Sequence, residues 1–202
     1  MKRAAVILSG GGSRRMGRDK AGLTLEGTCF LEALAARYAP WFDGVYLSTD
    51  RPGRYVLPGV EEVPDLRPGA QGPLAGLEAA LASTGAEQVF LTAVDLPLGT
   101  PELALRLLDG LEGADACCIR RRSGRLEPLF AAYRARCLPA ASACLDGGRR
   151  AMAALLERVQ LRVLEEAELP GFDLERQLLN VNRPEDLERA RLFLKKPFTR
   201  AL

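Results

Sequence analysis

The residues Leu8-Ser9-Gly10-Gly11-Gly12-Ser13-Arg14-Arg15-Met16-Gly17-Arg18-Asp19-Lys20 follow directly on an apolar run that begins at Ala4. The β-branched residues of this run and its abrupt stop at glycine predict a buried strand that enters a loop. Three consecutive glycines let backbone N–H groups approach an anion closely, and arginine and lysine side chains add positive charge in the same short segment. The stretch therefore predicts a phosphate-binding loop, with a nucleotide as its expected ligand.

Two standard phosphate motifs do not match this loop. Gly12 and Gly17 have the glycine spacing of a P-loop, but Arg18 and Asp19 occupy the positions that require Lys and Ser or Thr. The dinucleotide fingerprint needs a third glycine where Arg15 stands. The remaining alternative is a glycine-rich surface turn after an edge strand, which rarely gathers so many cations.

Length and composition are typical of a soluble globular protein. A chain of 202 residues fits one domain, which we expect to cover residues 1–194, followed by a tail at 195–202. No stretch is long and apolar enough to cross a membrane, and Gly10 interrupts the only candidate signal peptide. We therefore expect a cytoplasmic protein that does not bind membranes.

Charge and reactive side chains exclude several classes of function. A net charge of +2 is too small to indicate general binding of nucleic acid. The five cysteines form no C-x-x-C pair and are expected to be reduced and packed in the core. Histidine is absent, which excludes Ser-His and Cys-His catalysis and His-ligated metals. Chemistry must therefore use carboxylates, cations and amides, and a hard metal ion is a further option.

Strand and helix patterns alternate along the chain and predict an α/β protein. Besides the first strand, apolar runs predict strands at 44–50, 60–63, 88–94, 114–119, 127–133 and 160–164. Helical periodicity predicts helices that begin near residues 28, 73, 101, 138, 150 and 184. The first strand–helix–strand unit is expected to pair its strands in parallel with a right-handed crossover. Pro128 favours an edge position or the first positions of its strand.

Asp95 follows the apolar run 88–94 and is the second informative feature. Ligands of parallel α/β sheets bind outside the carboxyl ends of the strands, so Asp95 and the glycine loop are expected on the same rim. A carboxylate facing polyphosphate is repelled unless a cation lies between them, and Mg²⁺ binds one or two carboxylates together with phosphate oxygens. Asp95 is therefore a candidate Mg²⁺ ligand; the alternative is an acid that only caps a turn.

Two further segments are candidates for anion binding. Gly72 and Pro73 suit the start of a helix, whose positive N-terminal end would point toward the same site. The run Arg120-Arg121-Arg122-Ser123-Gly124-Arg125 predicts a hairpin tip. This tip is either a solvated turn or a contact for an anionic second substrate.

Residues 8–20 resemble the first motif of the molybdenum cofactor guanylyltransferases, the MobA-type members of the nucleotidyltransferases with a glycosyltransferase-A-like fold. The family pattern Leu-Ala-Gly-Gly-x-Ser-x-Arg-Met-Gly-x-Asp-Lys is matched, with Ser9 where Ala is usual. Further family motifs match, in the same order, residues 72–76, 95–97, 127–131 and 180–187. The resemblance covers nearly the whole chain and implies a three-layer, Rossmann-like fold with a central, mostly parallel (mixed) sheet flanked by helices.

The resemblance also implies roles for single residues. Ser48 stands where the family has an Asn, and Arg183 replaces the usual Thr before Pro184, which predicts a weaker helix cap that costs about 1 kcal/mol. The implied nucleotide contacts are Leu8, Ser9, Gly10, Gly11, Lys20, Ser48, Asp65, Gly76 and Asp95. The implied catalytic residues are Arg15, Lys20 and Asp95, the metal ligand is Asp95, and the second-substrate residues are Asn180, Asn182, Arg149 and Arg150.

The function that follows is transfer of GMP from GTP to the terminal phosphate of molybdopterin cofactor, with release of pyrophosphate and with Mg²⁺ as cofactor. Molybdoenzymes or other proteins of the cofactor pathway are further expected partners, and we expect a monomer. One alternative keeps the fold and changes the substrates, as a cytidylyltransferase on the same cofactor or a sugar-phosphate nucleotidyltransferase. A second alternative is a non-catalytic adaptor that delivers the cofactor.

Overall fold

The computed structural model describes residues 1–9, 24–25, 27–50, 53, 55–69 and 71–195. Within these ranges, seven strands form one mixed sheet in the order β5-β4-β1-β6-β8-β7-β9, and only β8 runs against the others. The strands are β1 (Arg3–Leu8), β4 (Gly44–Thr49), β5 (Val60–Pro64), β6 (Gln88–Ala93), β7 (Ala116–Arg120), β8 (Leu126–Arg134) and β9 (Leu161–Glu165). A small antiparallel pair joins β2 (Thr24–Leu25) to β3 (Thr28–Cys29).

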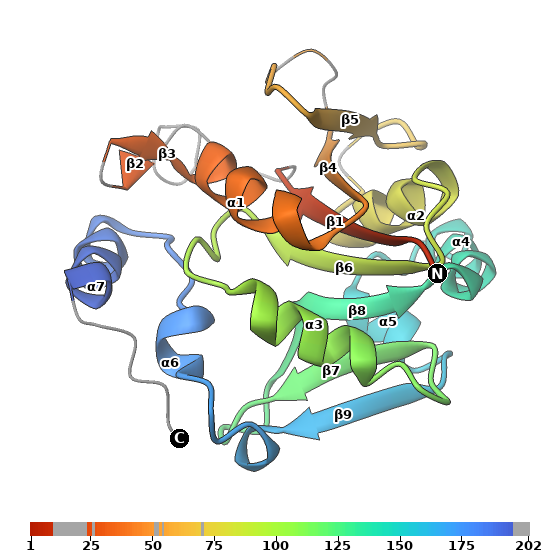
Figure 1. Cartoon of the computed structure of the whole chain (residues 1–202). Helices are drawn as coiled ribbons and strands as arrows, with labels where there is room; N and C mark the ends of the chain where they lie inside the picture. Colours follow the sequence, from red (N-terminus) through yellow and green to blue (C-terminus); the bar gives the residue numbers. More distant parts are fainter. Residues whose placement is uncertain (10–23, 26, 51–52, 54, 70, 196–202) are drawn as a thin grey trace.

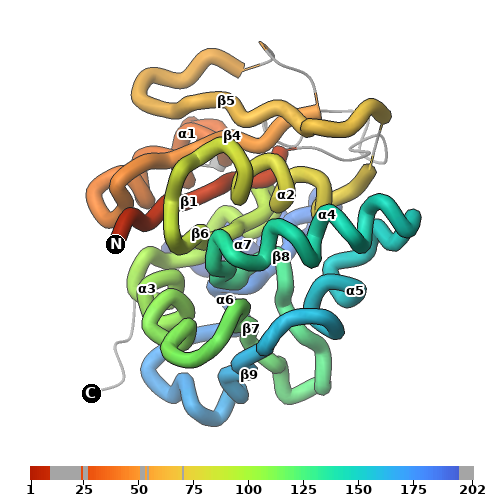
Figure 2. The backbone as a smooth tube through the Cα atoms, turned by 90° about the vertical axis from the view of Figure 1, so that its right-hand side faces the viewer, coloured from red at the N-terminus to blue at the C-terminus, as the bar shows by residue number. Residues whose placement is uncertain are grey.

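Helices cover both faces of this sheet (Figure 1). One face carries α1 (Phe30–Tyr38), α3 (Pro101–Asp109), α6 (Leu174–Gln177) and α7 (Pro184–Lys195), and the other carries α2 (Pro73–Ser83), α4 (Leu138–Asp146) and α5 (Met152–Leu156). Figure 2 shows the sheet between α3 on one side and α4 and α5 on the other. Short 3-10 helices are η3 (Ala39–Trp41), η4 (Ala135–Cys137) and η5 (Glu166–Glu168). The predicted three-layer α/β architecture is confirmed.

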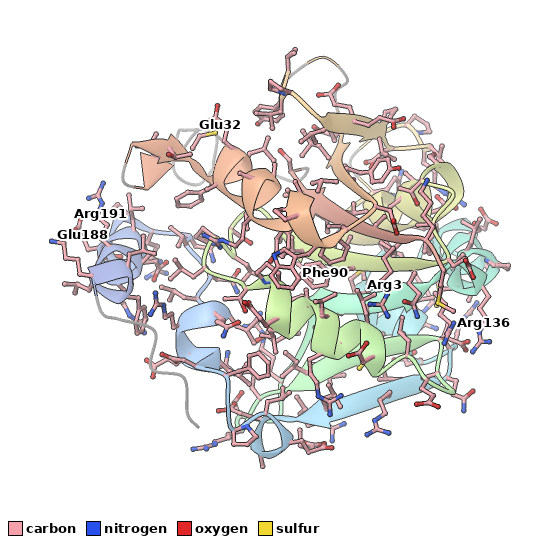
Figure 3. All side chains as sticks on the ribbon, viewed as in Figure 1. Arg3, Glu32, Phe90, Arg136, Glu188 and Arg191 are labelled. Carbon is pink, nitrogen blue, oxygen red and sulfur yellow. The ribbon has the colours of Figure 1, made fainter. Side chains whose placement is uncertain are left out.

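Two hydrophobic cores explain why the strands read as continuous apolar runs. In β1, Ala5 and Ile7 point to the α1 face, whereas Ala4, Val6 and Leu8 point to the α2 face. A strand that is covered on both faces has no solvent-facing position, so residues 4–8 of β1 are all apolar. On the α1 face, Phe90 lies between α1 and α3 (Figure 3) and packs against the rings of Tyr38, Phe42 and Phe130.

Several local predictions need correction. Thr28 and Cys29 belong to β3, and the helix begins after them, with Cys29 Sγ accepting a hydrogen bond from the Glu32 N–H. The helix expected to begin near residue 150 begins at Met152 and covers only Met152–Leu156. Lys195, the first residue of the expected tail, is still helical.

Pro128 lies among the first positions of its strand, as the third residue of β8, although β8 is a central strand and not an edge. The β6–β8 pairing ends at Phe130, and the β7–β8 register shifts between Cys118 and Arg120. Proline lacks an N–H, so it is tolerated where the ladder is interrupted. In the described part of the chain, no helix is long and apolar enough to span a lipid bilayer.

Candidate active site

The carboxyl ends of β1 and β6 mark the place where the strand order changes direction. The chain leaves β1 through α1 toward β4 on one side, and it reaches β6, on the other side of β1, through α2 on the opposite face. Ligands of open α/β sheets bind at such a switch point. Leu8, Ser9 and Asp95 lie at this position, as the sequence predicts.

Backbone hydrogen bonds hold the start of the glycine loop. The Ser9 N–H donates to the carbonyl of Ser48 at 3.0 Å, and the Val94 N–H donates to the carbonyl of Leu8 at 3.0 Å. The buried Ser9 hydroxyl has no hydrogen-bond partner in the described part of the chain. The predicted site residues Gly10, Gly11, Arg15 and Lys20 lie outside the described residues.

Gly76 of α2 packs directly against the ends of β1 and β4. A Cβ atom at this position would lie 2.5 Å from Ser48 Oγ and 2.7 Å from Leu8 Cδ2. The Ser48 side chain is 2% exposed, so it fills the contact between this helix and the sheet. Glycine therefore permits a close approach of α2 to the predicted nucleotide-binding edge.

Asp65 lies on the same rim, at the end of β5. Its backbone N–H donates to the carbonyl of Thr49 at 3.1 Å. Burial, together with the nearby carboxylates of Asp50 and Glu78, raises the pKa of Asp65 to about 6. A carboxylate with this pKa is ionised at neutral pH and protonated in mild acid.

If Asp65 contacts the nucleotide, GTP affinity is expected to fall as the pH is lowered from 7.5 to 5. Only the ionised carboxylate is a pure acceptor for a ligand hydroxyl or N–H group. Asp65→Asn should bind GTP more weakly at pH 7.5 and lose this pH dependence, as titration calorimetry across the pH range can measure. The same pH dependence in wild type and variant would contradict the contact.

Asp65→Asn should weaken GTP binding at pH 7.5 but make the folded protein more stable at that pH. The folded-state pKa of Asp65 lies above its unfolded value of about 3.9, so ionisation of this group opposes folding. The cost grows as pH rises through the interval from about 4 to about 6 and persists above it. Asp65→Asn is therefore expected to raise Tm at pH 7.5 and to leave it unchanged near pH 3.5.

Arg67 anchors the loop after Asp65 and was not singled out by sequence analysis. Its guanidinium donates to both oxygens of Glu78, at 2.7 and 2.8 Å, and to Asp146 Oδ1 at 2.6 Å. Glu78 is 3% exposed, and the hydrogen bonds from Arg67 lower its pKa. The arginine thus joins this loop to α2 and α4. The signal in the sequence is a single acid in the middle of the largely apolar helix α2.

The segment 180–182 lies beside Asp95 despite its separation along the chain. The Val181 N–H donates to the carbonyl of Asp95 at 2.8 Å, and the Val181 side chain is fully buried in the α1-face core. This contact brings the motifs around Asp95 and Asn180–Asn182 together at the rim. Asp95 itself is half-buried.

The start of α7, where Arg183 stands in place of the usual Thr, is held by the carboxylate of Asp186. The Asp186 carboxylate accepts hydrogen bonds from the backbone N–H groups of Asn182 and Arg183, both at 3.0 Å. These bonds are the half of a capping box that the N3 side chain supplies, while the Asp186 N–H, which a Thr at 183 could bind, donates to the Arg183 carbonyl at 3.1 Å. The same bonds hold Asn182 in place.

Arg149 and Arg150 lie in a different part of the site from Asn180 and Asn182. The carbonyl of Arg150 is 3.7 Å from the position of a Cβ on Gly72, at the N-terminus of α2. Arg149 pairs with Glu157 at 2.5 Å. The structure therefore places this arginine pair over the α2 face, and the asparagine segment over the α1 face.

Residues 121–125 form the predicted hairpin tip between β7 and β8, with the Arg121 N–H donating to the Arg125 carbonyl at 2.8 Å. The strand registers place this tip on the same rim as Asp95. Arg121 and Arg122 both pair with Glu166, and the Arg122 side chain is 84% exposed. A contact of this tip with a second substrate stays a prediction.

The carboxylate of Asp95 is compatible with a metal ion whose other ligands come from a bound nucleotide. In the described ranges, no group of three or more His, Cys, Asp or Glu side chains could enclose a metal. Mg²⁺ does not need such a group, since it binds one or two carboxylates together with phosphate oxygens and waters. Asp95 fits the first of these ligand types.

Comparison with known proteins agrees with this arrangement. The model of the MobA-like NTP transferase domain matches residues 5–162. The chain belongs to the MobA-like NTP transferase family. MobA-like relatives include a probable molybdenum cofactor guanylyltransferase from Pelotomaculum thermopropionicum, 33% identical over 95% of this chain and 93% of the relative. The molybdenum cofactor guanylyltransferase from Rhizobium meliloti is 34% identical over 94% and 91% of the two chains.

A solved MobA-like structure has the same fold. The molybdopterin-guanine dinucleotide biosynthesis protein A from Archaeoglobus fulgidus superposes with a TM-score of 0.82 at 28% identity. The match covers 96% of this chain and 100% of the other. The predicted membership in this nucleotidyltransferase family is therefore confirmed, and the protein is a nucleotidyltransferase.

Proposed function

We propose that the protein transfers GMP from GTP to the terminal phosphate of molybdopterin cofactor, with Mg²⁺ as cofactor and pyrophosphate as the second product. The observation that carries this proposal is the hydrogen bond from Val181 to Asp95, which joins a predicted nucleotide-binding motif to a predicted acceptor-binding motif. The names of the relatives from Pelotomaculum thermopropionicum and Rhizobium meliloti support the choice of guanine nucleotide and acceptor.

In the proposed reaction, an oxygen of the acceptor phosphate bonds to the α-phosphorus of GTP. The bond from this phosphorus to the oxygen bridging to the β-phosphate breaks, and pyrophosphate leaves with the electron pair. The acceptor phosphate is already ionised at neutral pH, so the reaction requires no general base, in agreement with a chain that contains no histidine. Catalysis then depends on positioning and on neutralisation of charge.

The residues divide this work between the two substrates. Leu8 and Ser9 bind the nucleotide through their backbone, while Arg15 and Lys20 of the glycine-rich motif neutralise the polyphosphate. Asp95 is the proposed ligand of Mg²⁺, which supplies further neutralisation of the phosphate oxygens when bound. Asn180 and Asn182 bind the acceptor, and Arg149 and Arg150 contribute charge from the other face.

The direct test is to measure pyrophosphate release by the purified protein with GTP, Mg²⁺ and molybdopterin, and to identify the guanine dinucleotide product by mass spectrometry. Pyrophosphate release that depends on all three reactants is expected. No product under these conditions would contradict the proposal, while turnover would exclude a non-catalytic adaptor.

Base selectivity can be measured without the acceptor. With Mg²⁺ present, GTP at about 100 times its Kd is expected to raise Tm by about 5–10 °C, because only the folded protein binds it. CTP, ATP and UTP at the same concentration should raise Tm less. A larger shift with CTP would instead indicate a cytidylyltransferase.

A further inference from the structure

One arginine of α1 donates hydrogen bonds to two carbonyls of the loop that carries Asp95. Arg37 Nη1 donates to the carbonyl of Pro97 at 2.6 Å and to the carbonyl of Gly99 at 2.9 Å. Both accepting residues are buried. Removing Arg37 would therefore take a hydrogen bond from each of two carbonyls that water reaches poorly, which costs free energy. One side chain thus holds two points of the chain, two and four residues after Asp95.

Packing leaves this loop little room to move toward the sheet. Leu96 and Leu98 are buried in the α1-face core. A Cβ on Gly99 would lie 2.3 Å from Phe130 Cε2. The apolar side chains therefore fix the loop against the α1-face core, and Arg37 binds its carbonyl groups.

Two other groups attach the same loop to the C-terminal part of the chain. Thr100 Oγ1 donates to Gln177 Oε1 of α6 at 2.9 Å, and the carbonyl of Asp95 accepts from Val181. A carboxylate that binds a metal must be held in one orientation, and groups behind such ligands commonly provide this. In this loop, the Val181 bond lies at Asp95 itself, and Arg37 is the side chain that holds the two carbonyls that follow it, at Pro97 and Gly99.

We propose that Arg37 is a positioning residue that orients Asp95 for binding of the metal and nucleotide. The inference rests on the proposed function, because it takes Asp95 as the ligand of a divalent cation. Arg37 acts through the backbone of Pro97 and Gly99 and does not touch the reactants.

The test compares Arg37→Ala and Arg37→Lys with a matched control. Arg134 also donates to backbone carbonyls, those of Leu111 and Ala114 at 2.8–3.2 Å. It pairs with Gln88 at the amino end of β6, the opposite rim from Asp95. Arg3 and Arg136, labelled in Figure 3, lie at that same far end. Arg134→Ala therefore removes a comparable arginine without affecting the Asp95 loop.

The main readout is the dissociation constant of the Mn²⁺–GTP complex from the protein, measured by titration calorimetry without any acceptor, because GTP itself binds Mn²⁺ in solution. Arg37→Ala is expected to raise this constant by about 10- to 100-fold. Arg37→Lys should recover most of the affinity, since one ammonium can replace the single donating nitrogen. Arg134→Ala should lower Tm and leave Mn²⁺ affinity unchanged.

Wild-type Mn²⁺ affinity in Arg37→Ala, or an equal loss in Arg134→Ala, would overturn the positioning role. If Arg37→Ala does not fold, Arg37→Lys and Arg37→Gln supply the comparison, and equal Mn²⁺ affinity in these two variants would overturn it as well. Normal binding of Mn²⁺ and GTP by the wild type without transfer to molybdopterin would contradict only the proposed function. No Mn²⁺ binding by the wild type with GTP would contradict both.

Discussion

Asp95→Ala is expected to lower kcat/KM for GMP transfer by about 10³-fold and to leave the fold intact. The half-buried side chain lies at a turn, so its loss opens no cavity in either core. Its proposed metal contributes several kcal/mol of charge stabilisation in the transition state, and each factor of ten in rate corresponds to about 1.4 kcal/mol. Steady-state pyrophosphate release at saturating Mg²⁺ measures the effect.

Two further variants make this result specific to the carboxylate at position 95. Asp95→Asn keeps the size of the side chain and removes its charge, so it should lose nearly as much activity. Asp109→Ala removes an exposed acid at the end of α3, where it pairs with Arg3, and should retain wild-type turnover. Full turnover in Asp95→Ala would show that the metal assignment is wrong.

Gly76→Val is expected to destabilise the protein by about 3 kcal/mol, which corresponds to a fall in Tm of about 10 °C. A Cβ alone would lie 2.5 Å from Ser48 Oγ and 2.7 Å from Leu8 Cδ2, and valine adds two methyl groups. Glycine in a helix interior costs about 1 kcal/mol relative to alanine, so the clash outweighs the gain in helix propensity. Thermal unfolding followed by circular dichroism measures the change.

The same substitution should weaken GTP binding, because α2 must move away from the ends of β1 and β4. Gly171→Ala is the control, since a Cβ there meets no atom within 4 Å and its backbone has no left-handed φ. This control should keep the wild-type Tm and GTP affinity. A Gly76→Val protein as stable as Gly171→Ala would mean that α2 is not tightly packed on the sheet.

Most of the fold could be predicted from local patterns. The inner strands β1, β4, β6 and β7 are covered on both faces, and this burial leaves runs that the sequence displays directly. Gly72 and Pro73 mark the start of α2 for local reasons. The backbone at Gly72 has a φ of 78°, which favours glycine, and proline is well tolerated at the first helical position. The β2–β3 pair and the four-residue α6 were not predicted, since such short elements carry no periodicity.

Polar contacts between distant segments could not be predicted in this way. Hydrophobic periodicity reports which positions are buried, but it does not report which donor reaches which acceptor. Arg67 with Glu78 and Arg37 with Pro97 are separated by 11 and 60 positions, and both depend on how helices pack. The chemistry of Pro128 predicted its place near the start of a strand, but it could not reveal that the strand is central or that the register shifts in β7.

By itself, the sequence determined the succession of strands and helices along the chain, the glycine-rich motif at 8–20 and an acid at the end of a central strand. These features depend on neighbouring residues, whose chemistry sets local conformation and burial. The tertiary structure alone decided that Val181 lies against Asp95, whereas Arg149 and Arg150 lie over the opposite face. Strand order and helix placement depend on contacts between residues far apart in the chain, and a linear pattern does not specify them.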